Sequence, residues 1–282
     1  MQAPDGPRFP ADAVTHDEAL TYYRNRATQL LCTAWERDGE PERFPWGVHV
    51  RLRRDRDVFH SLYVLRDHVG KGHLSAWRKA NPDARFVVMD ACAAVTAWLA
   101  HKQVAYVVAE PFSGYEYEAI RRFYGDRRAK RSGVWLMNHI DEGLFVLREL
   151  GASDTAMRAY CLHPLLQGDD DLARSYADGL QRRVDPDALL LALEYRQFAN
   201  RHLSRHRVPS PDAIALSPLP EVLQMLTADK IQNRKDFEEH HGTTHPEAAR
   251  LRAYFAEWFV RLGVEDVRYH ALVDEIRRRT GA

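Results

Sequence analysis

Three separate segments each place a possible metal ligand at the end of, or inside, an apolar stretch. The ligands are His139, His163 and Asp229. Imidazole nitrogens and carboxylate oxygens are what borderline and hard divalent cations bind in proteins. Each residue also has a structural alternative, because an imidazole can bind a backbone carbonyl and Asp229 can pair with a cation such as Lys230. The three lie far apart in the chain, so their spacing alone does not define a site.

A second pair of polar residues, Arg196 and Asn200, lies four residues apart on one expected helix. Residues at this spacing share a helix face, where a guanidinium and an amide can together bind a phosphate or a carboxylate. The same pair can instead brace a neighbouring helix, and Asp229 is an equally good partner for Arg196. The sequence leaves both interpretations open.

A glycine-rich segment at residues 67–73 contains Lys71 and His73 and precedes another expected helix. Glycines around a lysine before a helix can bind an anion through backbone amides and the helix N-terminus. The GxxxxGK[ST] spacing of a P-loop is absent. A flexible turn is therefore the competing interpretation.

Histidines gather in residues 236–245, which contain His240, His241 and His245. A metal ion would accept imidazoles, but these three crowd the end of one expected helix. We therefore expect a solvated helix terminus there.

The elements that position these residues begin with apolar residues at helical spacing over 17–36, which predict a first helix. Residues 47–52 alternate and residues 59–65 are rich in β-branched and aromatic side chains, which predicts a hairpin. The expected elements after it are a helix at 73–79, a strand at 86–89, a helix at 91–102 and a strand at 104–109. This order predicts a small α/β subdomain over residues 45–112.

From residue 115 onward the strand pattern disappears and helical spacing takes over. The expected helices are 115–124, 134–150, 154–163, 169–183, 187–205, 218–240, 246–262 and 265–279. The fold class expected is α+β and mainly α. We expect an N-terminal region over residues 1–125, with the small α/β subdomain, and an all-helical domain over residues 126–282.

Composition limits the classes of partner. The 282 residues carry 40 Lys and Arg against 40 Asp and Glu, so nothing attracts the whole chain to nucleic acid or to an anionic membrane surface. No uncharged run approaches the roughly 18 residues that a membrane-spanning helix needs. Three dispersed cysteines do not make a disulfide framework, which favours a reducing compartment and a cytoplasmic protein. The oligomeric state stays open, a homo-oligomer included.

Residues 130–237 resemble a known family. The string from Arg131 to His139 is followed by an apolar helix and Leu150-Gly151, then by Leu162-His163, and Ala228-Asp229-Lys230 with Asn233 closes the pattern. This order is similar to that of the HD-domain alarmone hydrolases of the RelA/SpoT type.

The resemblance implies an HD-like helical bundle with His139, His163 and Asp229 as metal ligands. It implies a divalent metal, manganese first with iron or zinc as alternatives, that activates water for attack on a phosphoryl ester. Four further residues would line the nucleotide pocket: Lys130, Arg131, Lys230 and Asn233.

The sequence also departs from the family pattern. Pro164 stands where the His-Asp dyad has its aspartate, and Gln167 and Gly168 stand where a catalytic Glu-Asp pair would follow. Asp169 and Asp170 come directly afterwards and are the candidates to replace the catalytic carboxylates. The alternative is that Asp169 caps a helix and its neighbours complement the helix dipole.

Three functions remain. The first is a metal-dependent phosphohydrolase that acts on a nucleotide or another small phosphorylated molecule, with Lys71, His73, Arg196 and Asn200 as further substrate contacts. The second is a catalytically inactive HD-like module that binds a nucleotide or a protein partner. The third is an enzyme of different chemistry on the same scaffold.

Overall fold

The chain forms two compact units. The computed structural model describes residues 13–89, 92–109, 112–130, 132–203 and 210–281. The first unit contains the described residues up to Phe112 together with residues 277–281, and the second contains Ser113–Ile276. The fold class is α+β and mainly α, as predicted.

The first unit is built on a mixed sheet. Its strands are β1 (Trp35–Arg37), β2 (Glu42–Phe44), β3 (Gly47–Arg54), β4 (Asp57–Val64), β5 (Phe86–Val88) and β6 (Tyr106–Val108). Its helices are α1 (His16–Gln29), α2 (His73–Ala80) and α3 (Ala93–His101), with a 3-10 turn, η1 (Arg66–His68). The strand order is β1-β3-β4-β5-β6, and β2 also pairs with β3.

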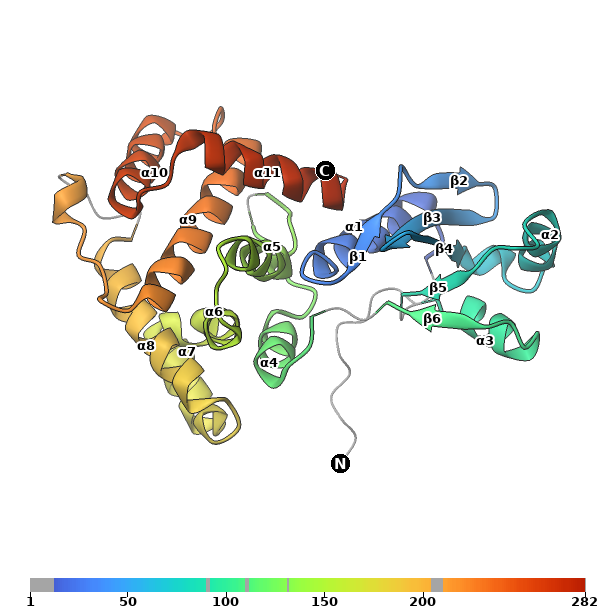
Figure 1. Ribbon diagram of the computed structural model, residues 1–282, viewed down its shortest axis with the longest axis horizontal. Helices are drawn as coiled ribbons and strands as arrows, with labels where there is room; N and C mark the ends of the chain where they lie inside the picture. Colours follow the sequence, from blue (N-terminus) through green and yellow to red (C-terminus); the bar gives the residue numbers. More distant parts are fainter. Residues whose placement is uncertain (1–12, 90–91, 110–111, 131, 204–209, 282) are drawn as a thin grey trace. The chain divides into compact units, whose positions relative to one another are not determined.

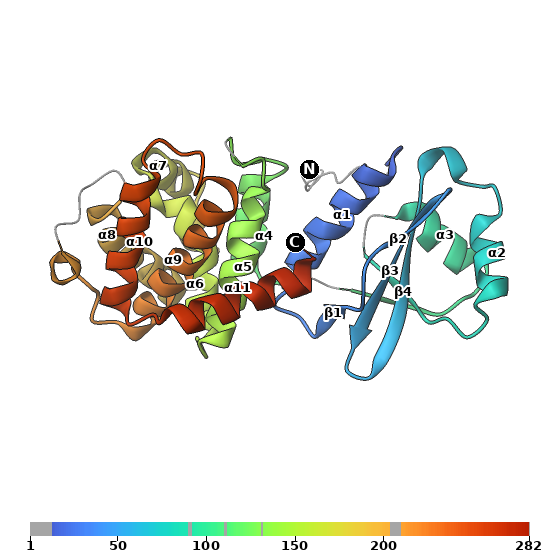
Figure 2. The same cartoon turned by 90° about the horizontal axis from the view of Figure 1, so that it is seen from above.

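The predicted hairpin is the long antiparallel pair β3 and β4 (Figure 2). β5 and β6 join in parallel, with α2 and α3 as the crossover helices between successive parallel strands. Alternation sorts the hairpin side chains between two faces. Tyr23 of α1 bonds to Ser61 on one face, whereas Trp77 of α2 packs on His49 and His60 of the other.

The first helix is shorter than predicted. Residues 17–36 were expected to be helical, but α1 ends at Gln29 and Trp35 already belongs to β1. The Thr33 hydroxyl bonds to the Leu30 carbonyl at 2.7 Å and accepts the Trp35 amide at 3.1 Å, which closes a turn. Trp35 then packs edge-on against Phe59 of β4, with ring centroids 5.2 Å apart. Tertiary packing therefore overrides the apolar periodicity after Gln29.

The second unit consists of helices (Figure 1). They are α4 (Tyr115–Tyr124), α5 (Leu136–Glu149), α6 (Asp154–Gln167), α7 (Asp169–Ala177), α8 (Pro186–Arg201), α9 (Pro220–His240), α10 (Ala248–Leu262) and α11 (Asp266–Thr280), with 3-10 turns η2 (Leu180–Arg182) and η3 (Pro211–Ala213). The last residues of α11, 277–280, belong to the first unit. α6 contacts α4, α5, α7, α8 and α9. A buried side chain on α6 is therefore close to several other helices.

Several boundaries differ from the sequence expectation; α7, expected over 169–183, ends at Ala177. α4 packs on α6 and belongs to the helical unit, so this unit begins at Ser113 and not after residue 125. The Tyr117 hydroxyl, for example, donates to Asp141 of α5 at 2.6 Å. α6 also continues through Pro164 to Gln167, where a helix end at residue 163 was expected.

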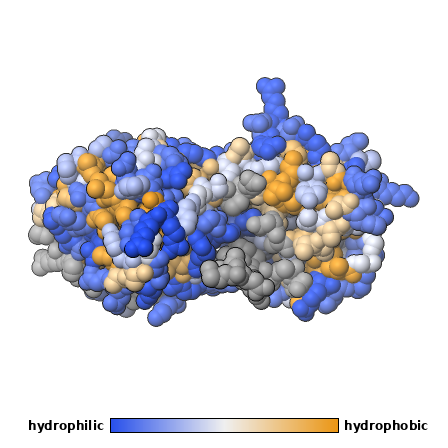
Figure 3. All heavy atoms as spheres, turned by 90° about the horizontal axis from the view of Figure 1, so that it is seen from below, coloured by the Kyte–Doolittle hydropathy of each residue, from blue (hydrophilic) through white to orange (hydrophobic). Residues whose placement is uncertain are grey.

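Hydrophilic residues cover most of the face shown in Figure 3, and hydrophobic ones form separate patches. Among the described residues, the most exposed large hydrophobic side chains are Val267, Val260 and Leu190. None of the described helices combines the length and the apolar character that crossing a bilayer requires.

Candidate metal centre

Three helices bring the three predicted ligands together. His139 lies on α5, His163 on α6 and Asp229 on α9, and one ligand atom of each falls within 4.8 Å of the others. The two Nε2 atoms are 3.1 Å apart, and His139 Nε2 is 3.6 Å from Asp229 Oδ1. Ligand atoms about 2.1 Å from one metal ion, at tetrahedral or octahedral angles, are about 3.0–3.4 Å apart. The arrangement therefore has the dimensions of part of a coordination shell.

Hydrogen bonding sets the tautomer of His163. Its Nδ1 lies 2.6 Å from the backbone carbonyl oxygen of Tyr160. A carbonyl only accepts, so Nδ1 carries the hydrogen and Nε2 keeps a lone pair. The rings of Tyr160 and Tyr195 pack on this imidazole with centroids 4.6 and 5.0 Å away. Burial in this aromatic shell, with His139 beside it, lowers the pKa of His163 to about 3.

A longer chain of contacts sets the tautomer of His139. Its Nδ1 is 2.6 Å from Gln232 Oε1, and Gln232 Nε2 is 3.1 Å from Glu142 Oε2. Glu142 is in turn paired with Lys235 at 3.0 Å. Burial raises the pKa of Glu142 to about 7 against the opposing effect of Lys235. As a carboxylate Glu142 only accepts hydrogen bonds, so the Gln232 amide then directs its NH₂ group at Glu142 and its oxygen at His139. His139 Nδ1 then donates, and its Nε2 also keeps a lone pair.

The two lone pairs face each other beside a carboxylate. At 3.1 Å two unprotonated imidazole nitrogens repel unless a cation or a proton lies between them. Orientation of a ligating histidine through its second ring nitrogen is the usual arrangement around protein-bound metals. The donor set, two imidazoles and one carboxylate, suits zinc, iron or manganese and leaves coordination positions open.

Asp229 is held ionised by its neighbours. Lys230 Nζ lies 2.8 Å from Oδ2, and Asn233 Nδ2 lies 2.8 Å from Oδ1. Burial alone would raise the pKa of Asp229, but Lys230, His139 and His163 together lower it to about 2. Lys230 and Asn233, predicted as substrate contacts, thus bind the Asp229 carboxylate in this structure.

A pocket of about 470 Å³ opens onto this cluster. His139, Asp229, Lys230 and Asn233 line it, and His163 contacts His139 from the buried side. The other lining residues supply aromatic rings, further imidazoles and a second carboxylate: Tyr124, Phe237, Tyr254, Phe255, His241, His245 and Asp236. The volume is within the range of small-molecule sites.

The structure does not bring Asp169 and Asp170 to the three ligands. Both are exposed in the first turn of α7, where acidic groups complement the helix dipole. Gly168, and not Asp169, is the N-cap of α7. Asp169 forms an ion pair with Arg196, and Asn200 Nδ2 donates to the Gln167 carbonyl at 2.9 Å. Arg196 and Asn200 therefore brace the junction of α6 and α7, the structural alternative for this pair.

The remaining predicted substrate contacts lie in three places. Lys130 is exposed, between the pocket-lining residues Ala129 and Ser132. Arg131 lies outside the described residues. Lys71 and His73 belong to the first unit, where Lys71 is exposed and His73 stacks on Trp46 with ring centroids 5.6 Å apart.

The histidine-rich end of α9 forms a second group of ligand-type atoms. Asp236, Glu239 and His240 bring theirs within 4.8 Å of one another. Glu239 and His240 are exposed, and Lys235 Nζ lies 2.8 and 3.1 Å from the two carboxylates. Lys235 also pairs with Glu142, so this one ammonium is shared among three carboxylates. The exposure of Glu239 and His240 fits the solvated helix terminus expected there.

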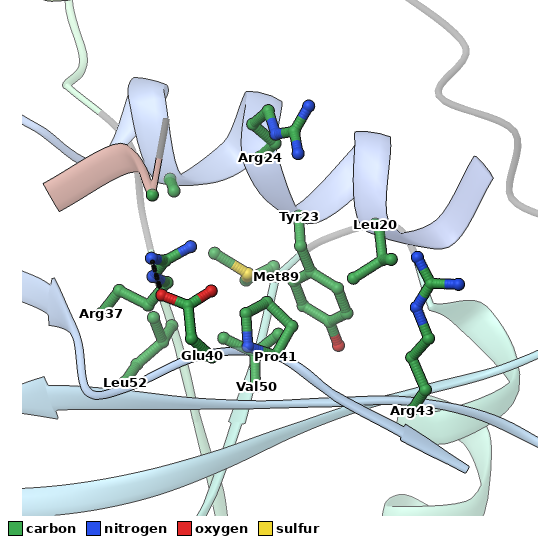
Figure 4. A pocket seen from close by; sticks show the side chains of 12 residues that line it. Leu20, Tyr23, Arg24, Arg37, Glu40, Pro41, Arg43, Val50, Leu52 and Met89 are labelled. Carbon is green, nitrogen blue, oxygen red and sulfur yellow. Dashed lines mark hydrogen bonds and ion pairs between the residues drawn. The ribbon is translucent and has the colours of Figure 1, made fainter. Parts of the chain in front are cut away.

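The first unit has a different pocket, of about 220 Å³, between α1 and the sheet (Figure 4). Its floor is apolar, and Arg24, Arg37 and Arg43 stand at its edge. Arg37 pairs with Glu40 at 3.0 Å, and Arg43 with Asp17 at 3.1 Å. Histidine and cysteine are absent from the lining of this pocket.

Sequence reasoning did not single out Gln232, Glu142, Tyr160 or Asp236. Spacing was the available signal: Glu142 follows His139 by three residues and Gln232 follows Asp229 by three. Residues at this spacing share a helix face. Such pairs are common, so only the structure separates these from the rest.

Comparison with known proteins gives no relative. No protein-family model, no curated protein and no solved structure matches the chain.

Proposed function

We propose that the protein is a metal-dependent phosphohydrolase acting on a nucleotide or another small phosphorylated molecule. His139, His163 and Asp229 would hold the divalent cation, with manganese first and iron or zinc as alternatives. One observation carries the proposal: two imidazoles direct unprotonated Nε2 atoms at each other, 3.1 Å apart, beside an ionised carboxylate at a pocket. When bound, a divalent cation would supply an activated water molecule and polarise a phosphoryl oxygen.

The side chains around the ligands support this role. Lys230 and Asn233 keep Asp229 ionised and fix its oxygens, which leaves the carboxylate ready to bind a cation. The pocket also offers hydrogen-bond donors for phosphoryl oxygens, among them Ser132 and Asn233. Its aromatic residues can pack on a ring or another apolar part of the substrate.

Asp236 is the second carboxylate of this pocket. It follows Asp229 by seven residues on α9, two helical turns along the same face. A carboxylate beside the reacting group can move a proton to or from water or the leaving group. We assign this role to Asp236, because Asp169 and Asp170 do not line the pocket.

A second function, the catalytically inactive module, also has an observation in its favour. Among the described residues that line the pocket, Lys230 is the single lysine or arginine, and its ammonium is bound to Asp229. A phosphate would therefore be bound mainly by neutral donors and by the cation. Such a module would bind a nucleotide or a protein partner without hydrolysis, and it would not need the cation.

Metal analysis combined with a hydrolysis assay tests both functions. The chain is purified with and without a chelator, its metal content is measured by mass spectrometry, and phosphate release from nucleotides and phosphomonoesters is followed with added Mn²⁺, Fe²⁺ or Zn²⁺. The phosphohydrolase predicts about one ion per chain and metal-dependent release. His163→Ala should lose both, and His245→Ala should keep the ion. A chain that binds no metal would refute the phosphohydrolase and favour the module, as would a chain that holds metal without hydrolysis.

A further inference from the structure

Pro164 lies inside α6, directly after the ligand His163, and the helix continues beyond it to Gln167. In an α-helix the amide of residue 164 would donate to the carbonyl of residue 160. Proline has no amide hydrogen. The Tyr160 carbonyl therefore has no helical donor at this position, although Tyr160 is completely buried.

His163 takes the place of the missing donor. Its Nδ1 lies 2.6 Å from the Tyr160 oxygen. His163 is itself buried, with 2% of its surface exposed, so both polar groups need a partner inside the protein. The bond between them satisfies the carbonyl and the ring nitrogen together.

We infer that Pro164 is a positioning residue for the metal centre, which keeps the Tyr160 carbonyl free for His163 and so directs His163 Nε2 at the ligand cluster. An amide hydrogen at residue 164 would compete for that carbonyl. His163 could then carry its hydrogen on Nε2, the tautomer that cannot bind a metal ion through this atom. The inference rests on the proposed metal site, but the tautomer can be measured without any metal.

Pro164 stands where the HD-type pattern that the sequence resembles has the aspartate of its His-Asp dyad. The positioning role gives the proline a function at that place. The position contributes no ligand of its own, because proline has no side-chain donor. It contributes the orientation of the preceding ligand. A helix interior normally excludes proline. Its presence one residue after a buried histidine removes the amide donor to the Tyr160 carbonyl, which alanine would keep.

Pro164→Ala in the full chain tests the inference. Alanine favours a helix interior over proline, so thermal unfolding of the metal-free variant should occur at the same or a higher temperature. Affinity for Mn²⁺ or Zn²⁺, measured by calorimetric titration, should nevertheless fall by about 10- to 100-fold. A purely structural role for Pro164 would not separate these two readouts. Pro186→Ala, at the first turn of α8, is the matched control and should keep the wild-type affinity.

Nitrogen-15 NMR of the histidine rings, recorded on the metal-free chain, gives the second readout. Wild-type His163 should show the Nδ1-protonated tautomer, and Pro164→Ala should show a loss of that tautomer. An unchanged tautomer together with unchanged metal affinity would overturn the inference. If the wild-type chain bound no metal at all, the proposed function would fail, and the tautomer comparison would still decide the role of Pro164.

Discussion

The Tyr160 hydroxyl lies directly against the backbone of Gly143. A Cβ atom at residue 143 would be 2.2 Å from the Tyr160 oxygen and 2.3 Å from two ring carbons. The same hydroxyl is 3.4 Å from the carbonyl of His139, one helical turn earlier on α5. The absence of a side chain at Gly143 thus lets α5 and α6 approach closely beside His139 and His163.

Gly143→Ala should disturb both stability and the metal centre. Tyr160 is fully buried, so its ring cannot move aside freely, and overpacking of this kind typically costs about 1–3 kcal/mol. Any shift of Tyr160 also moves the carbonyl that orients His163. Urea unfolding and metal titration should both show a loss. Gly168→Ala is the control, because its Cβ would meet only the side chain of Asp171, at 3.0 Å; an equal loss there would contradict this explanation.

Gln232→Met should weaken metal binding by removing the hydrogen bond that orients His139. Gln232 is fully buried and bonds to both His139 and Glu142. Methionine has a similar volume but neither hydrogen bond, so the expected cost is about 1–3 kcal/mol of stability and about a 10- to 100-fold loss of metal affinity. The matched variant is Gln224→Met on the same helix, whose amide has only a 3.5 Å contact with the Leu150 carbonyl. Similar metal affinities in the two variants would show that Gln232 does not orient His139.

Asp236→Asn should separate catalysis from metal binding. If Asp236 moves the proton, kcat should fall by about 100- to 10,000-fold, while the metal content stays at the wild-type level. Asp169→Asn should leave kcat unchanged, because Asp169 is 93% exposed and paired with Arg196. Steady-state kinetics on the two variants, with metal content measured in parallel, decides between them. Loss of activity in Asp169→Asn with normal activity in Asp236→Asn would reverse the assignment.

The contribution of His163 to the stability of the metal-free protein should fall as the pH is lowered, whereas Glu142, whose pKa burial raises to about 7, acts in the opposite direction. The folded chain holds the pKa of this imidazole at about 3, whereas the unfolded chain protonates it near the ordinary value of about 6.5. Unfolding therefore takes up a proton between these pH values. The contribution of His163 to the free energy of unfolding is complete above about pH 6.5. It should fall by about 2.5 kcal/mol between pH 7 and pH 4.5.

Urea unfolding in the presence of a chelator measures this dependence. His163→Asn removes the His163 contribution, so on lowering the pH from 7 to 4.5 the free energy of unfolding of this variant should change by about 2.5 kcal/mol in the stabilising direction relative to wild type. His270→Asn, at an exposed position of α11, should keep the wild-type slope. Equal slopes in wild type and His163→Asn would mean that another group dominates the acid response.

Local patterns were sufficient for most of the helical unit. α4 coincides with the predicted residues 115–124, and α9 and α11 begin or end within two residues of their predicted bounds. Apolar spacing fixes such helices because each buries one face. α1 was predicted too long, since the turn at Thr33 and the packing of Trp35 on Phe59 depend on a strand that comes later in the chain.

The sequence by itself determined the residue types that could bind a cation, His139, His163 and Asp229, and the helices that carry them, because helical periodicity is a local property. Only the tertiary structure decided that these three meet, that Asp169 turns outward to Arg196, and that Gln232 and the Tyr160 carbonyl orient the imidazoles. Such contacts join helices separated by many residues. Their geometry follows from packing such as that of Tyr160 against the bare backbone of Gly143, which no local pattern encodes.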